Sequence, residues 1–377
     1  MITGLCGANC HRNGATSEGV DYMIQDRIDI WNKGEYNYPA AFGFEPNLMT
    51  YLHDEDEIIR PGMLIIPGGG YEFVSAREGE LVALDFYERG YNCFVLTYTV
   101  NLLAAVPLRM QALEDAARAM RLIRRIAPAY YTDPEKITVL GFSAGGHLAA
   151  SLCVHHQDTI EIDSRLSSVS PRPDAAVLCY PVITTGELTH AGTIRALLGF
   201  ASVNDEYESD IKIPGASEWL SNNVIPGCTT RKEQLEYASL DKHVTAGVPP
   251  TFIWHTMEDQ TVPVENSLLY MNALRRNGVP RAIHIFSNGR HGLSLANSAW
   301  ADYRQNGSFT YEQVNNFTRM ALDGVIEVSN ETKKDLVMNS HFGTGVLTRD
   351  DQPVPEVTVW PLLADMFLKH TFGLEEA

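Results

Sequence analysis

A serine on a glycine-flanked turn is the residue of this chain with the clearest capacity for chemistry. The stretch "VLGFSAGGHLAAS" at 139–151 places Gly141, Ser143 and Gly145 in the pattern G-x-S-x-G, after an apolar run and before a helical pattern. A nucleophilic serine needs this context, because larger side chains two residues away would clash in the strained turn. The helix that follows also points its free N–H groups at a developing negative charge. The alternative is a serine in a glycine-rich bend that merely opens a helix.

A nucleophilic serine also requires a base and an acid that orients the base. Asp259 ends a predicted strand, and its neighbour Glu258 is the rival acid. His291 lies in a glycine-flanked loop after the following predicted strand, so the chain order is serine, acid, histidine, as in α/β-hydrolases. The sequence therefore predicts Ser143 as nucleophile, Asp259 as acid and His291 as base.

Three consecutive glycines could supply the oxyanion hole, the backbone amides that stabilise the negative charge on the substrate oxygen. They end an early apolar run in "IIPGGGYEF" (65–73), and glycine lets the backbone approach a substrate and present its amides. The run lacks the Gly-Lys-Ser/Thr of a Walker loop and the spacing of a dinucleotide fingerprint, which argues against both nucleotide-binding motifs. The predicted oxyanion donors are the amides of Gly69, Gly70 and Ala144.

The elements that must position these residues alternate along the chain. Near-continuous apolar strands alternating with helices predict a mostly parallel central sheet with helices on both faces. We expect one domain over 1–377, because neither a linker nor an internal repeat divides the chain. The predicted strands are 47–53, 62–70, 92–100, 137–141, 174–183, 249–259 and 281–288, and the predicted helices are 77–90, 107–128, 145–156 and 264–278.

Two polar segments, 185–247 and 297–355, interrupt this alternation. Both leave the sheet from the C-terminal ends of strands, where ligands bind in parallel α/β sheets. We expect at least one of these two elaborations to cover the site and restrict the acyl pocket to short chains. Alternatively, they pack onto the core or form a subunit contact. Their candidate wall residues are Trp219, Leu220, Trp300, Tyr303, Phe309 and Tyr311.

The helix predicted at 107–128 carries four arginines on its polar side. On one face of one helix in an acidic protein, they indicate a solvated surface rather than a nucleic-acid patch. These arginines are Arg118, Arg121, Arg124 and Arg125.

Composition narrows the classes of function. The 377-residue chain has a formal charge of −18, which is unfavourable for binding nucleic acid or an anionic membrane. The N-terminus lacks a signal-peptide pattern, and the chain lacks the roughly 20-residue apolar run of a membrane span. Six scattered cysteines favour reduced thiols and hence a cytoplasmic protein. Cys6, Cys10 and His11 do not complete a metal-ligand pattern.

Four motifs in order give the chain a resemblance to a known family. They are "PGGGYEFVSAREGELVA", "GFSAGGHLAAS", "FIWHTMEDQTVPVENSLLY" and "HGLSLA", within about 46–296, and a C-terminal helix "WPLLADMFLKHTFG" follows. These residues resemble the bacterial acetyl xylan esterase-like α/β-hydrolases, which are relatives of the hormone-sensitive-lipase type of esterase. Pro67 stands where lipase-like relatives often have histidine.

The resemblance implies an α/β-hydrolase fold, hydrolysis of short acyl esters, often acetyl groups on sugars, and no metal or organic cofactor. Carried over by position, it gives the same roles to Ser143, Asp259 and His291, and to the amides of Gly69, Gly70 and Ala144. The expected partner is a small-molecule or oligosaccharide ester, with neither nucleic acid nor membrane, and the sequence is compatible with a homo-oligomer. The alternatives are a peptidase or arylformamidase of the same fold, or a non-catalytic ligand-binding protein.

Overall fold

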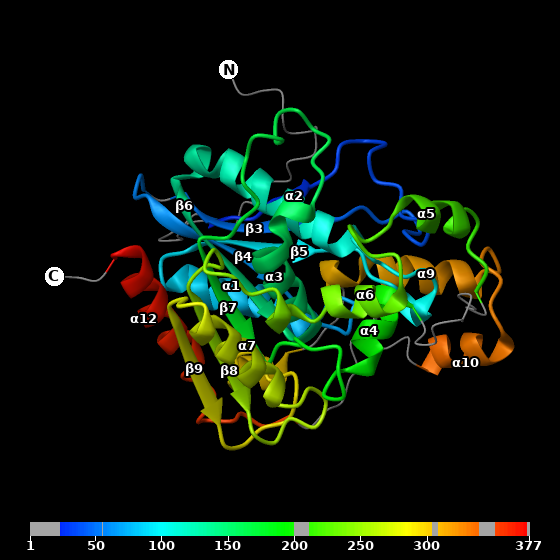
Figure 1. The fold of residues 1–377 in the computed structure, drawn as a ribbon. Helices are drawn as coiled ribbons and strands as arrows, with labels where there is room; N and C mark the ends of the chain where they lie inside the picture. The colour runs from blue at the N-terminus through cyan, green and yellow to red at the C-terminus, as the bar shows by residue number, and fades with distance from the viewer. Residues whose placement is uncertain (1–22, 55, 200–210, 304–307, 339–350, 375–377) are drawn as a thin grey trace.

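A nine-stranded sheet forms the centre of the protein. The computed structural model describes residues 23–54, 56–199, 211–303, 308–338 and 351–374. Within these residues the strand order is β1-β3-β5-β4-β6-β7-β8-β9, and β2 pairs with β3 (Figure 1). The strands are β1 (Met23–Ile24), β2 (Arg27–Asp29), β3 (Asn47–His53), β4 (Arg60–Ile66), β5 (Asn92–Thr97), β6 (Thr132–Phe142), β7 (Ala175–Cys179), β8 (Thr251–Thr256) and β9 (Arg281–Phe286).

The sheet is mostly parallel, as the alternation of strands and helices predicts. β5, β4, β6, β7, β8 and β9 run parallel, whereas β3 is antiparallel to β5. Each of the seven predicted strands coincides with an observed one. The two short strands β1 and β2 at the antiparallel edge are not predicted, because two or three residues carry no periodic pattern.

Helices cover both faces of the sheet because its strands are apolar on both sides. In β4, Leu64 and Ile66 face one hydrophobic cluster, while Met63 and Ile65 face the other. The first cluster includes side chains of α2 (Gln111–Ile126), α3 (Ser143–His155) and α7 (Glu265–Arg276). The second includes side chains of α1 (Glu80–Glu88) and α12 (Trp360–Phe372).

The two elaborations contain more regular structure than their sequence predicts. Their helices are seven to eleven residues long in most cases, which is too short for a clear apolar period, and local caps mark their starts. Thr230, for example, forms a capping box with Glu233. The helices are α4 (Ala191–Leu198), α5 (Ala216–Asn222), α6 (Arg231–Tyr237), α8 (Ser298–Asp302), α9 (Glu312–Leu322) and α10 (Asn330–Met338), most of them on the right in Figure 1.

The cysteines of the described chain are free thiols. Cys93, Cys153 and Cys179 are buried and Cys228 is half-buried, whereas Cys6, Cys10 and His11 lie outside the described residues. Across the described ranges we find no helix that combines the length and apolar character needed to cross a membrane.

The expectation that the arginines of α2 form a solvated face is wrong for three of the four. Arg118 is only 2% exposed, Arg121 is also buried, and Arg124 is half-buried and pairs with Asp174 at 3.0 Å, whereas Arg125 is exposed. Arg118 pairs with Glu35 and with Glu161, each at 2.6 Å. Its guanidinium also stacks on Trp31 and donates to the Ile30 carbonyl. The polar side of α2 is therefore covered by two loops whose carboxylates neutralise it.

Replacement of Arg118 by alanine is expected to lower the free energy of unfolding by about 3–5 kcal/mol, because it leaves a buried carboxylate unpaired. The Glu161 side chain is only 3% exposed, so water does not replace the lost partner. Urea denaturation followed by circular dichroism measures the loss. Arg125→Ala on the same helix is the control and should keep the wild-type midpoint. Equal midpoints for both variants would contradict the structural role of the Arg118 ion pairs.

Candidate active site

Three side chains that follow three different strands are joined by hydrogen bonds in a continuous series. Ser143 follows β6, Asp259 follows β8 and His291 follows β9, all at the C-terminal ends of parallel strands. The Ser143 Oγ lies 2.8 Å from His291 Nε2, and His291 Nδ1 lies 2.6 Å from Asp259 Oδ2. Since a carboxylate only accepts, His291 donates through Nδ1–H, and its Nε2 accepts the Ser143 hydroxyl proton. The residues that the sequence selects are thus brought together in a geometry suited to serine activation.

Close backbone packing explains the two glycines around Ser143. Ser143 itself has a φ of 52°, in the left-handed region that non-glycine residues seldom adopt. A Cβ on Gly145 would lie 2.2 Å from the Ile66 carbonyl oxygen, and one on Gly141 would lie 2.3 Å from that of Gly145. Only glycine fits at either position: at Gly145 because the turn contacts the end of β4, and at Gly141 because the end of β6 contacts the start of α3.

Asp259 is held in a dense set of donors. Its Oδ1 accepts from the amides of Thr261 and Val262, both at 2.9 Å. Its Oδ2 accepts from His291 and lies 3.3 Å from Nε2 of the buried His255. Burial alone would raise the pKa of Asp259, but the hydrogen bonds from His255 and His291 outweigh it and hold that pKa below its ordinary value. The carboxylate is therefore ionised and fixed in orientation.

The rival carboxylate of Glu258 points elsewhere. Its side chain is exposed, and its Oε2 accepts from the amide of Gly289 at 3.1 Å. Of the two neighbouring acids, Asp259 is the one that contacts His291.

The three glycines lie directly beside Ser143. A Cβ on Gly68 would be 2.9 Å from the Ser143 Cβ, and the Gly68 amide donates to Glu78 at 2.8 Å. Gly69 and Gly70 have φ values of 121° and 66°, and their amides have no acceptor among the described residues. These two amides remain available to a ligand. Ala144 follows Ser143 in the first turn of α3, where helix amides lack intrahelical partners.

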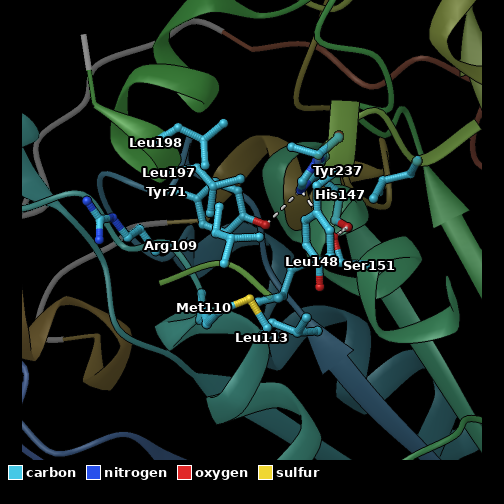
Figure 2. Close-up of a pocket in the computed structure, with 14 residues that line it drawn as sticks. Tyr71, Arg109, Met110, Leu113, His147, Leu148, Ser151, Leu197, Leu198 and Tyr237 are labelled. Carbon is cyan, nitrogen blue, oxygen red and sulfur yellow. Dashed lines mark hydrogen bonds between the residues drawn. The ribbon is translucent and has the colours of Figure 1, made fainter. Parts of the chain in front are cut away.

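A buried hydrogen bond ties the glycine loop to α3. Figure 2 shows Tyr71 and His147 directed toward one another, beside a cavity of about 20 Å³. His147 donates through Nε2 to the Ala238 carbonyl at 3.0 Å, so its Nδ1 accepts from the Tyr71 hydroxyl, also at 3.0 Å. Burial lowers the pKa of His147 to about 4, which keeps the ring neutral. Tyr71 follows Gly70 directly, and the contact therefore fixes the loop that carries the two free amides.

A second buried network supports the other side of the loop. Glu78 accepts from the Tyr180 hydroxyl at 2.7 Å and from the Gly68 amide, and burial raises the pKa of its carboxyl. Tyr180 also accepts from the Ser294 amide at 2.9 Å, and its ring meets His291 edge-on at 5.0 Å. The network joins the glycine loop to the loop that carries His291. Sequence patterns do not indicate it, since Glu78 and Tyr180 lie 102 residues apart.

Ser143 and His291 open into a cleft of about 890 Å³. The first elaboration contributes His190, Gly192 and Arg195 to its wall, and the second contributes Tyr311. Both elaborations therefore border the site, and whether either of them covers it stays a prediction. The restriction to short acyl chains stays a prediction.

Most of the expected wall residues pack inward instead. Tyr311 lines the cleft. Trp219 packs edge-on against Tyr38 at 5.2 Å, and Trp300 belongs to the hydrophobic cluster that includes side chains of α1 and α12. For these two tryptophans the core-packing alternative is correct. The remaining three are half-buried and do not border the cleft: Leu220, Tyr303 and Phe309. In the described part of the chain, groups of three or more histidine, cysteine or acidic side chains suited to a metal ion are absent.

The fold and the position of this site define an α/β-hydrolase. The solved structure of MGS-M1, an α/β hydrolase from a Medee basin deep-sea metagenome library, is 26% identical, with a TM-score of 0.55, and covers 93% of this chain and 99% of its own. The family model BD-FAE matches residues 48–274, more than half of the chain, and the protein belongs to this family.

Three named relatives are similar to this chain over most of its length. An acetyl ester-xyloside bifunctional hydrolase from Caldicellulosiruptor lactoaceticus is 35% identical, with a TM-score of 0.60, over 80% of this chain and 97% of its own. The endo-1,4-beta-xylanase B of Butyrivibrio fibrisolvens is 44% identical over 76% of this chain, and the acetylxylan esterase of Xylanibacter ruminicola is 27% identical over 63%. The chain spans only 41% and 42% of the lengths of these two curated relatives.

The buried His147 makes stability dependent on pH. Because its pKa of about 4 in the folded protein is below the ordinary 6.5, the unfolded chain binds more protons between these values, and stability is lost as the pH falls through this window. His147→Gln removes that contribution. The stability difference between wild type and variant should shrink by about 3 kcal/mol from pH 7 to pH 4. Urea unfolding at both pH values measures it, and an unchanged difference would contradict a neutral, buried His147.

Proposed function

We propose that this protein is a serine esterase that removes short acyl groups, chiefly acetyl, from xylan-derived oligosaccharides. The single observation that carries the proposal is the hydrogen-bonded series Ser143–His291–Asp259, beside the free amides of Gly69 and Gly70 in one cleft. A nucleophile, a base, an orienting acid and oxyanion donors are the full set of groups that acyl transfer needs.

In the proposed mechanism, Ser143 attacks the ester carbonyl while His291 takes its proton through Nε2. Asp259 holds the imidazole in the productive tautomer and stabilises the imidazolium. The amides of Gly69, Gly70 and Ala144 receive the oxyanion, each typically worth about 3 kcal/mol of transition-state stabilisation. His291 then gives the proton to the leaving alcohol, and water repeats the sequence on the acyl-enzyme.

The substrate class rests on the cleft and on the named relatives. Two of these relatives carry names that specify acetyl or acetylxylan ester hydrolysis. The cleft of about 890 Å³ is far larger than an acetyl group needs, and polar side chains, including Glu72, Arg195 and Arg290, contribute to its wall. This size and polarity suit a sugar-bearing alcohol, with the short acyl group held at Ser143.

Glycosidic-bond cleavage, which the xylanase name of one relative suggests, is less consistent with this cleft. Most glycoside hydrolases use two carboxyl groups that flank the bond. Of the residues that line the described cleft, Glu72 and Glu78 carry carboxylates, and both are engaged. Glu78 binds Tyr180 and Gly68, and Glu72 pairs with Arg195 at 3.3 Å. We therefore assign ester cleavage to this chain. Amide cleavage stays an alternative, and a cytoplasmic location, one domain over the full length and a homo-oligomer stay predictions.

Ser143→Ala is expected to lower kcat for acetyl esters by about three decades or more, because the acyl-enzyme cannot form. The assay compares p-nitrophenyl acetate with acetylated xylo-oligosaccharides, and thermal denaturation checks the fold. Ser221→Ala, at an exposed position of α5, is the matched control and should retain wild-type turnover. Near wild-type turnover of purified Ser143→Ala would show that another residue is the nucleophile.

The two neighbouring acids should differ strongly in effect. Asp259→Asn is expected to reduce kcat by at least about a hundredfold, since an asparagine in this position favours the wrong imidazole tautomer. Glu258→Gln changes only an exposed side chain that binds the Gly289 amide, and it should stay within a few-fold of wild type. Steady-state kinetics on p-nitrophenyl acetate gives the ranking. The reverse ranking would assign the orienting role to Glu258.

A further inference from the structure

His190 lies in the cleft without any role in the proposed acyl transfer. It precedes α4 as its N-cap residue and lines the cleft together with Ser143 and His291. A Cβ on Gly70 would lie 3.9 Å from His190 Cε1, so the imidazole borders the glycine loop that faces the reacting carbonyl. His190 therefore lies in the cleft that Ser143 faces, beside the glycine loop.

The cap of α4 fixes the tautomer of His190. The Thr193 amide donates to His190 Nδ1 at 3.2 Å, and the Thr193 hydroxyl lies 2.8 Å from the same nitrogen. Because a backbone amide only donates, Nδ1 carries a lone pair and the ring proton of neutral His190 is on Nε2. The described chain contains no hydrogen-bond partner for this Nε2–H. One donor of defined orientation is thus left for a ligand.

The surroundings of His190 favour the neutral ring. Burial lowers the pKa of His190, and the nearby charges of His291 and Arg195 lower it further, against an opposing effect of Asp259. A neutral imidazole N–H donates well to an uncharged oxygen such as a hydroxyl, and it lacks the net charge with which an imidazolium would attract an anion. Arg195 and Glu72, which pair across the same wall, add further polar groups for a sugar.

We propose that His190 Nε2–H donates a hydrogen bond to a sugar hydroxyl adjacent to the acylated position, which makes His190 a specificity-determining residue. The proposal rests on the proposed esterase function. It gives the N-cap of α4 a second role, because the hydrogen bonds that cap this helix also orient the donor in the wall of the cleft. His190 would then favour esters of polyols over simple aryl esters.

The chain offers a matched pair of variants to test this role. His190→Asn keeps an acceptor for the Thr193 amide, since asparagine is a preferred N-cap residue, but it lacks the outer donor. His190→Gln reaches the position of Nε2 with an amide donor but is a poorer cap. His370→Asn, at an exposed position of α12, is the control. Each is assayed on p-nitrophenyl acetate, on methyl 2-O-acetyl-β-xylopyranoside and on its 3-deoxy analogue.

The expected result is a loss of preference rather than a general loss of rate. Wild type should favour the 3-hydroxyl substrate over the 3-deoxy analogue, and His190→Asn should reduce that ratio by about fivefold, the usual effect of one neutral hydrogen bond. His190→Gln should recover part of the ratio, and His370→Asn should keep it. An equal loss on all three esters, or an unchanged ratio, would overturn the role of His190. Wild type inactive on every ester would instead overturn the proposed function.

Discussion

The contact on which the rest of the site depends is the approach of the β6–α3 turn to the end of β4. Gly145 packs so closely on the Ile66 and Pro67 carbonyls that a Cβ would stand 2.2 and 2.3 Å from their oxygens. This contact brings the turn that carries Ser143 against the loop that carries Gly69 and Gly70. Because it joins backbone to backbone, it fixes the Ser143 backbone relative to the oxyanion donors without relying on a side-chain contact.

Buried polar side chains then hold the loops that this contact brings together. Tyr71 and His147 tie the glycine loop to α3, and Glu78 and Tyr180 tie the same loop to the segment after His291. Hydrogen bonds of this kind are strong in a low-dielectric interior and costly when broken, so they favour a single arrangement. The proposed active site is therefore preorganised from both sides, and little rearrangement is needed when charge develops on the substrate.

The sequence predicts the parts of this site that depend on local patterns. Ser143 is indicated by its flanking glycines, and Asp259 and His291 by their places after apolar strands. His190 and the Tyr71–His147 contact are not predicted, because the partners come from distant segments and a lone histidine carries no periodic signal. Arg118 shows the same limit: the helical period identifies the polar side of α2, but the loops that bury this side are fixed only by tertiary packing.

The ion pairs around the cleft show how a strongly acidic protein can present arginines to the neutral substrate that we propose. Arg77 and Arg290 both bind Asp351, each at 2.5 Å, and both lie over the ring of Trp300. These two arginines hold the pKa of Asp351 below its ordinary value, against the opposing effect of burial. Arg195, which also lines the cleft, is paired with Glu72. These three guanidinium groups are paired with only two carboxylates, so their combined net charge is small. Each guanidinium still carries several N–H donors of fixed direction. Such a surface can donate to hydroxyl oxygens and gives a polyanion little advantage, which suits the acetylated sugar that we propose as substrate.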